Sequence, residues 1–463
     1  MKTRRDFFSS MANGVHGAAL LSMLHAEQRS YDLTAKRSHF PGKAKAVIHL
    51  FMNGGPSQVD LFDPKPTLTR LHGSKPSREL AFAISNGDEA GVLMKSPFEF
   101  KPRGKSGMMI SDAMPHLAEC ADDIALINSM YGEHANHEPA LFLIHSGRTI
   151  ASRPSIGSWV AYGLGTENQN LPAYVVLDDP KGLPINGISN WQSAWLPPIY
   201  QGTRFRTEGP PVLNLLPRPE IPTALMDAER DLVRTLDAAH RSSRPMQPEL
   251  DARISSFELA ARMQMAATDA LDLSKETEAT REAYGLNQPA TESYGKRCLM
   301  ARRLVERGVR FVQLYIETQI WDSHDNVKKS LDYACGKTDK PVAALLKDLK
   351  QRGLLDSTLV VWGGEFGRLP ISQGKGEIAG RDHGPNGFSS WLAGGGVKGG
   401  VTYGTTDDIG FKAAENKVSV HDFHATILHQ LGLNHRDLTL ERHGLKERLT
   451  DQFPARVVRE ILA

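Results

Sequence analysis

Short apolar runs that alternate with longer amphipathic segments constrain this chain more than any other feature. The runs are rich in β-branched and aromatic residues, mostly bounded by Gly, Pro, Asp or Asn, and cover residues 46–52, 172–177, 309–316 and 358–362. Their near-continuous apolar character predicts strands that are buried on both faces. Helical patterns cover residues 223–240, 249–271, 291–307 and 343–352, and the last two lead directly into strands. This alternation predicts an α/β fold in which a mostly parallel sheet has helices on both sides.

The chain divides into a leader and one large domain. Residues 1–30 read as the leader and residues 43–463 as the α/β domain. Within that domain, residues 190–217 are rich in Pro, Trp and Gly and predict an irregular excursion, and residues 223–286 are helical. Since no obvious linker separates them, we expect residues 190–290 to form an insertion on the same domain.

The leader resembles a twin-arginine export signal. Arg4 and Arg5 precede two phenylalanines and a weakly apolar run that ends near Leu24, a pattern typical of exported proteins. The run contains Asn13 and His16 and is too short and polar for a stable membrane span. The alternative is an amphipathic N-terminal helix. Export of an already folded protein predicts a periplasmic or extracellular location and fits a cofactor that is inserted beforehand.

Composition excludes some classes of partner. The sequence has 55 basic and 53 acidic residues, which leave a formal charge of +2. Since no basic block interrupts this balance, a nucleic-acid partner is not expected. The three cysteines, Cys120, Cys298 and Cys335, lie far apart without a CxxC spacing, which predicts buried thiols and neither a disulfide framework nor a zinc knuckle.

Chemistry-bearing side chains follow two of the predicted strands. Glu365 follows residues 358–362 in VVWGGEFGR, and Asp322 and His324 come soon after residues 309–316. Functional groups in open α/β sheets gather at such strand ends. The spacing of Asp322 and His324 puts both side chains on one face of an extended segment, where they suit zinc, manganese or iron better than calcium. The alternative for Glu365 is an ion pair with Arg368.

Two further segments offer ligands. In GRDHGPNGF, one of Asp382 and His383 is expected to ligate an ion and the other to orient it. In GEHANHEPALFLIH, Pro139 predicts a helix start, so that His137 lies near a helix N-terminus, which favours anions. The alternative is that His134 and His137 are solvated or capping residues. His145 lies within the apolar run and is expected in the core.

The motifs RLVERGVRFVQLY, WDSHDN, DLKQRGLLDSTLVVWGGEFGR, GRDHGPNGF, WLAGGGVKGGVTYG and HDFHATILHQLGL resemble the family called domain of unknown function 1501. The segments FMNGGPSQVDLFDPKP and RPSIGSWVAYGLGTENQNLPAYVVL extend the resemblance over nearly all of the chain after the leader. The family is similar to the alkaline phosphatase and sulfatase superfamily. The resemblance implies an alkaline-phosphatase-like three-layer α/β/α sandwich.

The resemblance also implies metals at the strand ends and an ester substrate. Asp322 and His324 look like the Asp and His of one metal site, and His383 looks like its later histidine. Glu365 falls where the superfamily usually has an Asp, but Phe366 replaces the histidine of that pair. His137 falls at the position of the sulfatase nucleophile.

These matches predict one or two divalent ions, zinc first, with manganese, iron or calcium as alternatives. The predicted metal ligands are Asp322, His324, His383 and Glu365. The predicted catalytic residues are Glu365, as a ligand or general base, together with His137 and Asp382. The predicted contacts to an anionic substrate are Asn53, Ser57, His134, Arg148, Arg368 and Arg381, with Ser57 also a distant candidate for the nucleophile.

The sequence therefore predicts an exported metal-dependent hydrolase that directs a metal-activated water at a sulfate or phosphate ester. A sulfated or phosphorylated glycan is one such substrate. The competing hypothesis is an exported binding protein that keeps the fold, with or without the metal, and has no turnover. That alternative is favoured by Phe366, by the absence of the CxPxR sulfatase motif, and by Asn53, which stands near the position where the superfamily usually has a first-strand aspartate.

Overall fold

The computed structural model describes residues 32–83, 90–209, 212, 222–244, 247–374 and 378–463. The predicted export leader, residues 1–30, lies outside them. No helix among the described residues has the length and apolar character that a bilayer crossing requires.

A large central sheet organises the molecule. In the described part of the chain it has nine strands in the order β14, β5, β13, β9, β1, β8, β6 and β7, with β17 pairing beside β5. Their bounds are β1 Ala46–Phe51, β5 Ile124–Tyr131, β6 Tyr174–Leu177, β7 Thr203–Phe205, β8 Phe311–Leu314, β9 Thr358–Gly363, β13 Phe388–Ala393, β14 Val401–Tyr403 and β17 Val418–Ser419. β1 pairs in parallel with β8 and β9, while β13 is antiparallel to both of its neighbours. The predicted mostly parallel sheet is confirmed.

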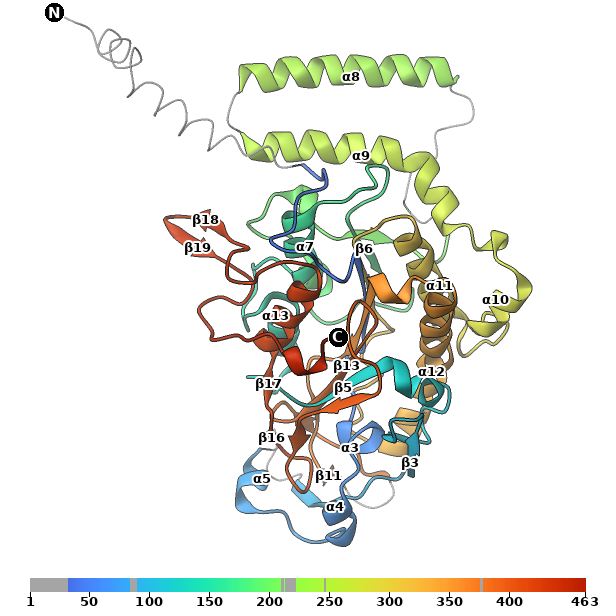
Figure 1. The fold of residues 1–463 in the computed structure, drawn as a ribbon, viewed down its shortest axis with the longest axis vertical. Helices are drawn as coiled ribbons and strands as arrows, with labels where there is room; N and C mark the ends of the chain where they lie inside the picture. The colour runs from blue at the N-terminus through green and yellow to red at the C-terminus, as the bar shows by residue number, and fades with distance from the viewer. Residues whose placement is uncertain (1–31, 84–89, 210–211, 213–221, 245–246, 375–377) are drawn as a thin grey trace, which may run out of the picture.

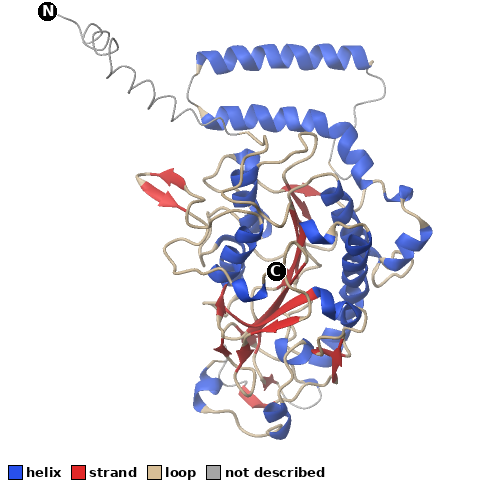
Figure 2. Cartoon of the chain, viewed as in Figure 1, coloured by secondary structure: helices blue, strands red, loops and turns tan. Residues whose placement is uncertain are grey.

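Helices cover both faces of this sheet (Figures 1 and 2). α11 (Glu292–Glu306) and α12 (Val327–Gln351) lie on one side, and α7 (Ile156–Leu164) and α13 (Val420–Gln430) lie on the other. All six residues of β1 are buried, as are all six of β9. The apolar content of these strands therefore follows from burial on both faces.

About half of the strands of the sheet and part of one helix were not predicted from the sequence. The predicted strands overlap β1, β6, β8 and β9, but β5 and β13 were not predicted. The helix predicted at residues 343–352 is only the end of α12, which begins at Val327 and continues through Pro341. Proline usually ends or starts a helix because it lacks an N–H donor. Here the packed side chains around Pro341, which is itself buried, hold the helix together.

Helices of the predicted insertion lie at one end of the molecule (Figure 1). α8 (Thr223–Ser243) is outermost, α9 (Pro248–Leu271) lies between it and the body, and α10 (Glu278–Ala283) follows. The short strand β7 pairs with β6 within the stretch predicted as irregular.

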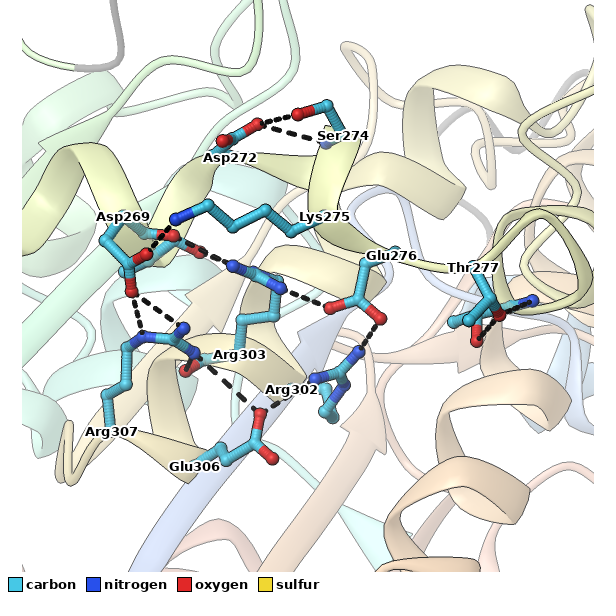
Figure 3. Close-up of polar contacts among 12 residues, drawn as sticks. Asp269, Asp272, Ser274, Lys275, Glu276, Thr277, Arg302, Arg303, Glu306 and Arg307 are labelled. Carbon is cyan, nitrogen blue, oxygen red and sulfur yellow. Dashed lines mark hydrogen bonds and ion pairs between the residues drawn. The ribbon is translucent and has the colours of Figure 1, made fainter.

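An ion-pair network fastens this insertion to α11 (Figure 3). Glu276 lies 2.6 Å from Arg302 and also pairs with Arg303. Asp269, in α9, lies 2.9 Å from Arg307. Arg302 and Arg303 are nearly inaccessible to solvent. Arg302 also pairs with Glu306 and Asp348, so loss of Glu276 would remove the carboxylate partner of buried Arg303 above all, which is destabilising.

Candidate metal centre

Four side chains from distant parts of the chain meet at one edge of the sheet. One ligand atom from each of His137, Asp322, His324 and His383 lies within 4.8 Å of the others. The Nε2 atoms of His324 and His383 are 2.9 Å apart. Asp322 Oδ1 lies 2.9 Å from His324 Nε2 and 3.2 Å from His383 Nε2. Asp322 Oδ2 lies 3.3 Å from His137 Nε2.

The topology explains why these residues meet. Asp322 and His324 follow β8, and His383 lies in β12 (His383–Gly384), beyond the end of β9. His137 follows β5 as the first residue of α6 (His137–Ser146). β13 is antiparallel to both β5 and β9, so β5, β8 and β9 run in the same direction. Their carboxyl ends therefore share one edge of the sheet, where ligands of open α/β proteins bind.

Two glycines let the segments of this edge approach closely. Gly54, just after β1, has a φ of +113°, and a Cβ there would lie 2.6 Å from the backbone nitrogen of Asp322. A Cβ on Gly380 would lie 2.0 Å from the carbonyl carbon of His324. Only glycine fits at either position without moving the backbone that carries the ligands.

Glu365 orients His137 from behind the cluster. Its Oε1 lies 2.7 Å from His137 Nδ1 and accepts a second hydrogen bond, of 3.0 Å, from the Gly54 backbone N–H. A carboxylate only accepts hydrogen bonds, so His137 Nδ1 carries a proton and its Nε2 faces Asp322. Glu365, predicted as a metal ligand, thus lies outside the four-residue cluster, next to one of its members.

The other ligands are held in the same way. Gln373 Oε1 lies 2.6 Å from His324 Nδ1, which directs His324 Nε2 toward the cluster. Arg368 Nη2 donates to Asp322 Oδ1 at 2.6 Å. The Arg368 guanidinium also donates to backbone carbonyls, including those of Gly55 at 3.0 Å and Arg381 at 3.2 Å. It is fully buried, so its role here is to fix Asp322.

The electrostatics of the cluster favour positive charge at its centre. Burial alone would lower the pKa of His137, but the adjacent carboxylates of Asp322 and Glu365 outweigh it and raise that pKa to about 9. Burial alone would raise the pKa of Asp322, but contacts with three imidazoles and with Arg368 hold it far below its usual range. The carboxylates of Asp322 and Glu365 stabilise a positive charge on His137. A bound metal cation would be stabilised by carboxylates in the same way.

The donor set fits a divalent transition metal. Three imidazoles and one carboxylate are typical zinc ligands, and atoms about 2.0 Å from a tetrahedral ion lie about 3.3 Å from one another. The oxygens of Asp322 lie 2.9 to 3.3 Å from the three imidazole nitrogens, close to that spacing, and one ligand atom from each of the four residues lies within 4.8 Å of the others. His137 Nε2 is buried, and although it lies near Asp322 it makes no well-directed hydrogen bond. A cation would give this nitrogen the partner it lacks.

Three of the six predicted substrate contacts make ion pairs or hydrogen bonds within the chain. Arg381 is fully buried and pairs in bidentate fashion with Asp60, at 2.7 and 2.9 Å. Ser57 donates to the same carboxylate at 2.5 Å. Arg148 pairs with Asp451 at 2.6 Å and lies beyond the far end of α6, about 15 Å along the helix from His137. Arg381 and Ser57 are thus committed to internal contacts, whereas the Arg148 side chain is 37% exposed but lies away from the cluster.

The remaining predicted residues lie beside the cluster. Asn53 is buried and holds the end of β8 through the backbone of Ile316, at 2.9 Å to its carbonyl. Asp382 Oδ1 accepts from the His383 backbone N–H at 2.8 Å and lies 3.9 Å from His324 Nδ1. His134 Nδ1 accepts from the backbone N–H of Asn136 at 3.0 Å. None of the three is in the four-residue cluster.

Sequence reasoning missed Gln373 altogether. Its segment, ISQGKGE, has no pattern that marks a ligand-orienting amide, and only the fold brings it to His324. His145, predicted in the core, is buried and contacts Gln313 and Tyr315.

The protein thus has a mixed α/β fold with a cluster of possible metal ligands at the carboxyl edge of its sheet. The model of the family described as "Protein of unknown function (DUF1501)" matches residues 44–462, and the chain belongs to this family. No protein in the curated collection of characterised proteins matches the chain.

Solved structures with a related fold include members of the alkaline phosphatase and sulfatase superfamily. TAB5 alkaline phosphatase, in a mutant form, has 12% identity and a TM-score of 0.37, covering 85% of this chain and 99% of that one. The lipoteichoic acid synthase LtaP from Listeria monocytogenes has 9% identity and a TM-score of 0.36, covering 89% and 78%. The PsFucS1 sulfatase from Pseudoalteromonas sp. has 10% identity and a TM-score of 0.34, covering 90% and 70%. Similarity this low assigns no role to any residue of this chain.

Proposed function

We propose that this protein is an exported, metal-dependent hydrolase of phosphate or sulfate esters. One observation carries the proposal, namely the convergence of His137, Asp322, His324 and His383 at the carboxyl edge of the sheet. Zinc is the metal that this donor set suits best. A bound zinc would supply Lewis-acid chemistry, which lowers the pKa of a coordinated water and neutralises an anionic oxygen.

The open side of the cluster is where an ester would approach. The His324 side chain is 37% exposed and that of Asp322 is 21% exposed, whereas His137 and His383 are close to 10%. The N-terminus of α6 begins at His137, and the positive end of its dipole favours an anionic group there. Both features support an anionic substrate.

Glu365 and Gln373 act in this proposal as positioning residues. Each accepts a hydrogen bond from the Nδ1–H of a histidine, so each holds the Nε2 of that histidine toward the centre of the cluster. This role differs from the ligand or general-base role predicted from the sequence, and it rests on the hydrogen bonds that the Glu365 carboxylate accepts from His137 and the Gly54 N–H.

Metal analysis tests the first step. The full chain, purified and incubated with zinc, is expected to retain about one ion per molecule after removal of excess metal. His324→Ala and His383→Ala are expected to lose it, and His134→Ala, which alters a histidine outside the cluster, is expected to keep it. No retained metal in the wild type, or equal retention in all variants, would refute the metal site.

Turnover is tested on the zinc-loaded protein. Aryl phosphate and aryl sulfate esters are the substrates, and activity is expected to be lost in His324→Ala and kept in His134→Ala. Metal binding without hydrolysis of any ester would favour the second candidate, a non-catalytic binding protein. The commitment of Ser57 to Asp60 is the observation that favours this candidate, since it removes the one hydroxyl predicted as a nucleophile.

A further inference from the structure

Phe366 packs against two of the four side chains that form the candidate metal centre. The centroid of its ring lies 4.8 Å from that of His137 and 4.6 Å from that of His383, and the ring planes are tilted by 42° and 33°. The two imidazoles are themselves 4.3 Å apart, in an edge-to-face arrangement. Phe366 therefore contacts both imidazoles while offering no atom that could bind an ion.

The Phe366 ring is enclosed by its other neighbours. A Cβ on Gly55, in the segment after β1, would lie 2.6 Å from Cδ2 of the ring, and Gly55 has a φ of +83°, which glycine adopts without strain. The guanidinium carbon of Arg368 lies over the ring, 5.8 Å from its centroid. Phe366 is 1% exposed. The ring thus has little room to turn, and it keeps water from the part of the cluster that it covers.

His383 depends on this packing more than the other two histidines do. Nδ1 of His137 lies 2.7 Å from the Glu365 carboxylate. Nδ1 of His324 lies 2.6 Å from the Gln373 amide oxygen. In contrast, Nδ1 of His383 is buried and has no hydrogen-bond partner among the described residues. A metal-binding histidine is usually oriented by a hydrogen bond at its second nitrogen, and at His383 ring packing is the contact that remains.

We propose that Phe366 is a positioning residue of the metal centre, which orients His383 and keeps its side of the cluster dry. The Nε2 atom of His383 lies 3.2 Å from Asp322 Oδ1, and the Phe366 ring fixes the imidazole in that orientation. An apolar shell beside a metal limits solvent access to it. Water and substrate then approach from the exposed side of His324. This inference rests on the proposed function, because it assigns a role within the same site.

Zinc affinity and cobalt(II) substitution test this role in the full chain. Phe366→Leu keeps an apolar side chain but removes the ring that contacts His383 and His137. Its zinc dissociation constant is expected to rise about 10-fold, a loss typical of an orienting partner. The visible absorption of the cobalt(II)-loaded variant is expected to be weaker than that of the wild type. The physical reason is that water entering the site raises the coordination number, and six-coordinate cobalt(II) absorbs less than four-coordinate cobalt(II).

Phe311→Leu is the matched control. Phe311 is also 1% exposed, but it is the first residue of β8 and so lies at the opposite edge of the sheet. Its ring contacts those of His49 and Tyr174, which are not in the cluster. Loss of a buried ring is expected to lower the free energy of unfolding in both variants, as measured with urea. Only Phe366→Leu is expected to change zinc affinity and the cobalt(II) spectrum.

The possible results separate this inference from the proposed function. A wild-type chain that retains no zinc would refute the metal site and the role of Phe366 with it. If the wild type binds zinc and Phe366→Leu binds it as tightly, with an unchanged cobalt(II) spectrum, the positioning role alone is overturned. Equal losses of zinc affinity in Phe366→Leu and Phe311→Leu would also overturn it, since both losses would then come from general destabilisation.

Discussion

At the scale of single residues, the metal centre depends on hydrogen bonds that set which nitrogen of each histidine faces inward. Glu365→Gln keeps the size of the side chain but removes the negative charge of the carboxylate, which accepts hydrogen bonds from His137 Nδ1 and the Gly54 N–H. Loss of such an orienting partner typically lowers metal affinity 10- to 100-fold. We expect a fall of that size, measured by zinc competition with a chromogenic chelator.

The control for this prediction is Glu133→Gln, which alters a nearby exposed carboxylate that is not part of the cluster. Its zinc affinity is expected to equal that of the wild type. If Glu365→Gln bound zinc as tightly as both, the orienting role of Glu365 would be wrong.

The candidate site shows what sequence can and cannot supply at this scale. Asp322, His324 and His383 were predicted from chemistry-bearing residues at or near strand ends, and the structure brings them together. The roles of Arg381 and Ser57 were not predicted because both depend on Asp60, whose proximity no local pattern indicates. Similarly, β5 and β13 lack a clear bounded pattern, so the strand that delivers His137 was not predicted.

At the scale of elements, two glycines offer opposite outcomes for the same substitution. Gly336 lies on the exposed side of α12, and a Cβ there would meet nothing within 4 Å. Because alanine loses less backbone entropy in a helix, Gly336→Ala is expected to raise the free energy of unfolding by about 1 kcal/mol. A Cβ on Gly380 would overlap the backbone of His324, so Gly380→Ala is expected to abolish zinc retention.

Urea denaturation and metal analysis of the two variants check this pair. A destabilised Gly336→Ala would show that α12 is strained near Pro341. Normal zinc retention in Gly380→Ala would show that the loop of His324 moves without consequence for the site.

At the scale of the whole molecule, buried histidines make stability depend on pH. Burial lowers the pKa of His49 and of His424 to about 3 each, whereas an unfolded histidine titrates near 6.5. Below about pH 6.5, His49 and His424 are therefore protonated in the unfolded chain but stay neutral in the native state. The stability from these two groups is complete above pH 6.5 and is lost as the pH falls toward 3, by about 1.4 kcal/mol per pH unit for each.

His49→Phe isolates this effect, since His49 contacts the rings of Phe51 and Phe311. The difference in unfolding free energy between wild type and variant, measured by urea at pH 4.5 to 7, is expected to shift in favour of the variant as the pH falls. A difference that stays constant over that range would mean that His49 is not neutral in the native state.

The ligands of the metal centre are spread from residue 137 to residue 383. During synthesis on the ribosome, no partial chain that ends before His383 holds the complete set, however well its earlier strands have paired. If the cluster holds a metal as proposed, uptake would therefore follow translation of most of the polypeptide.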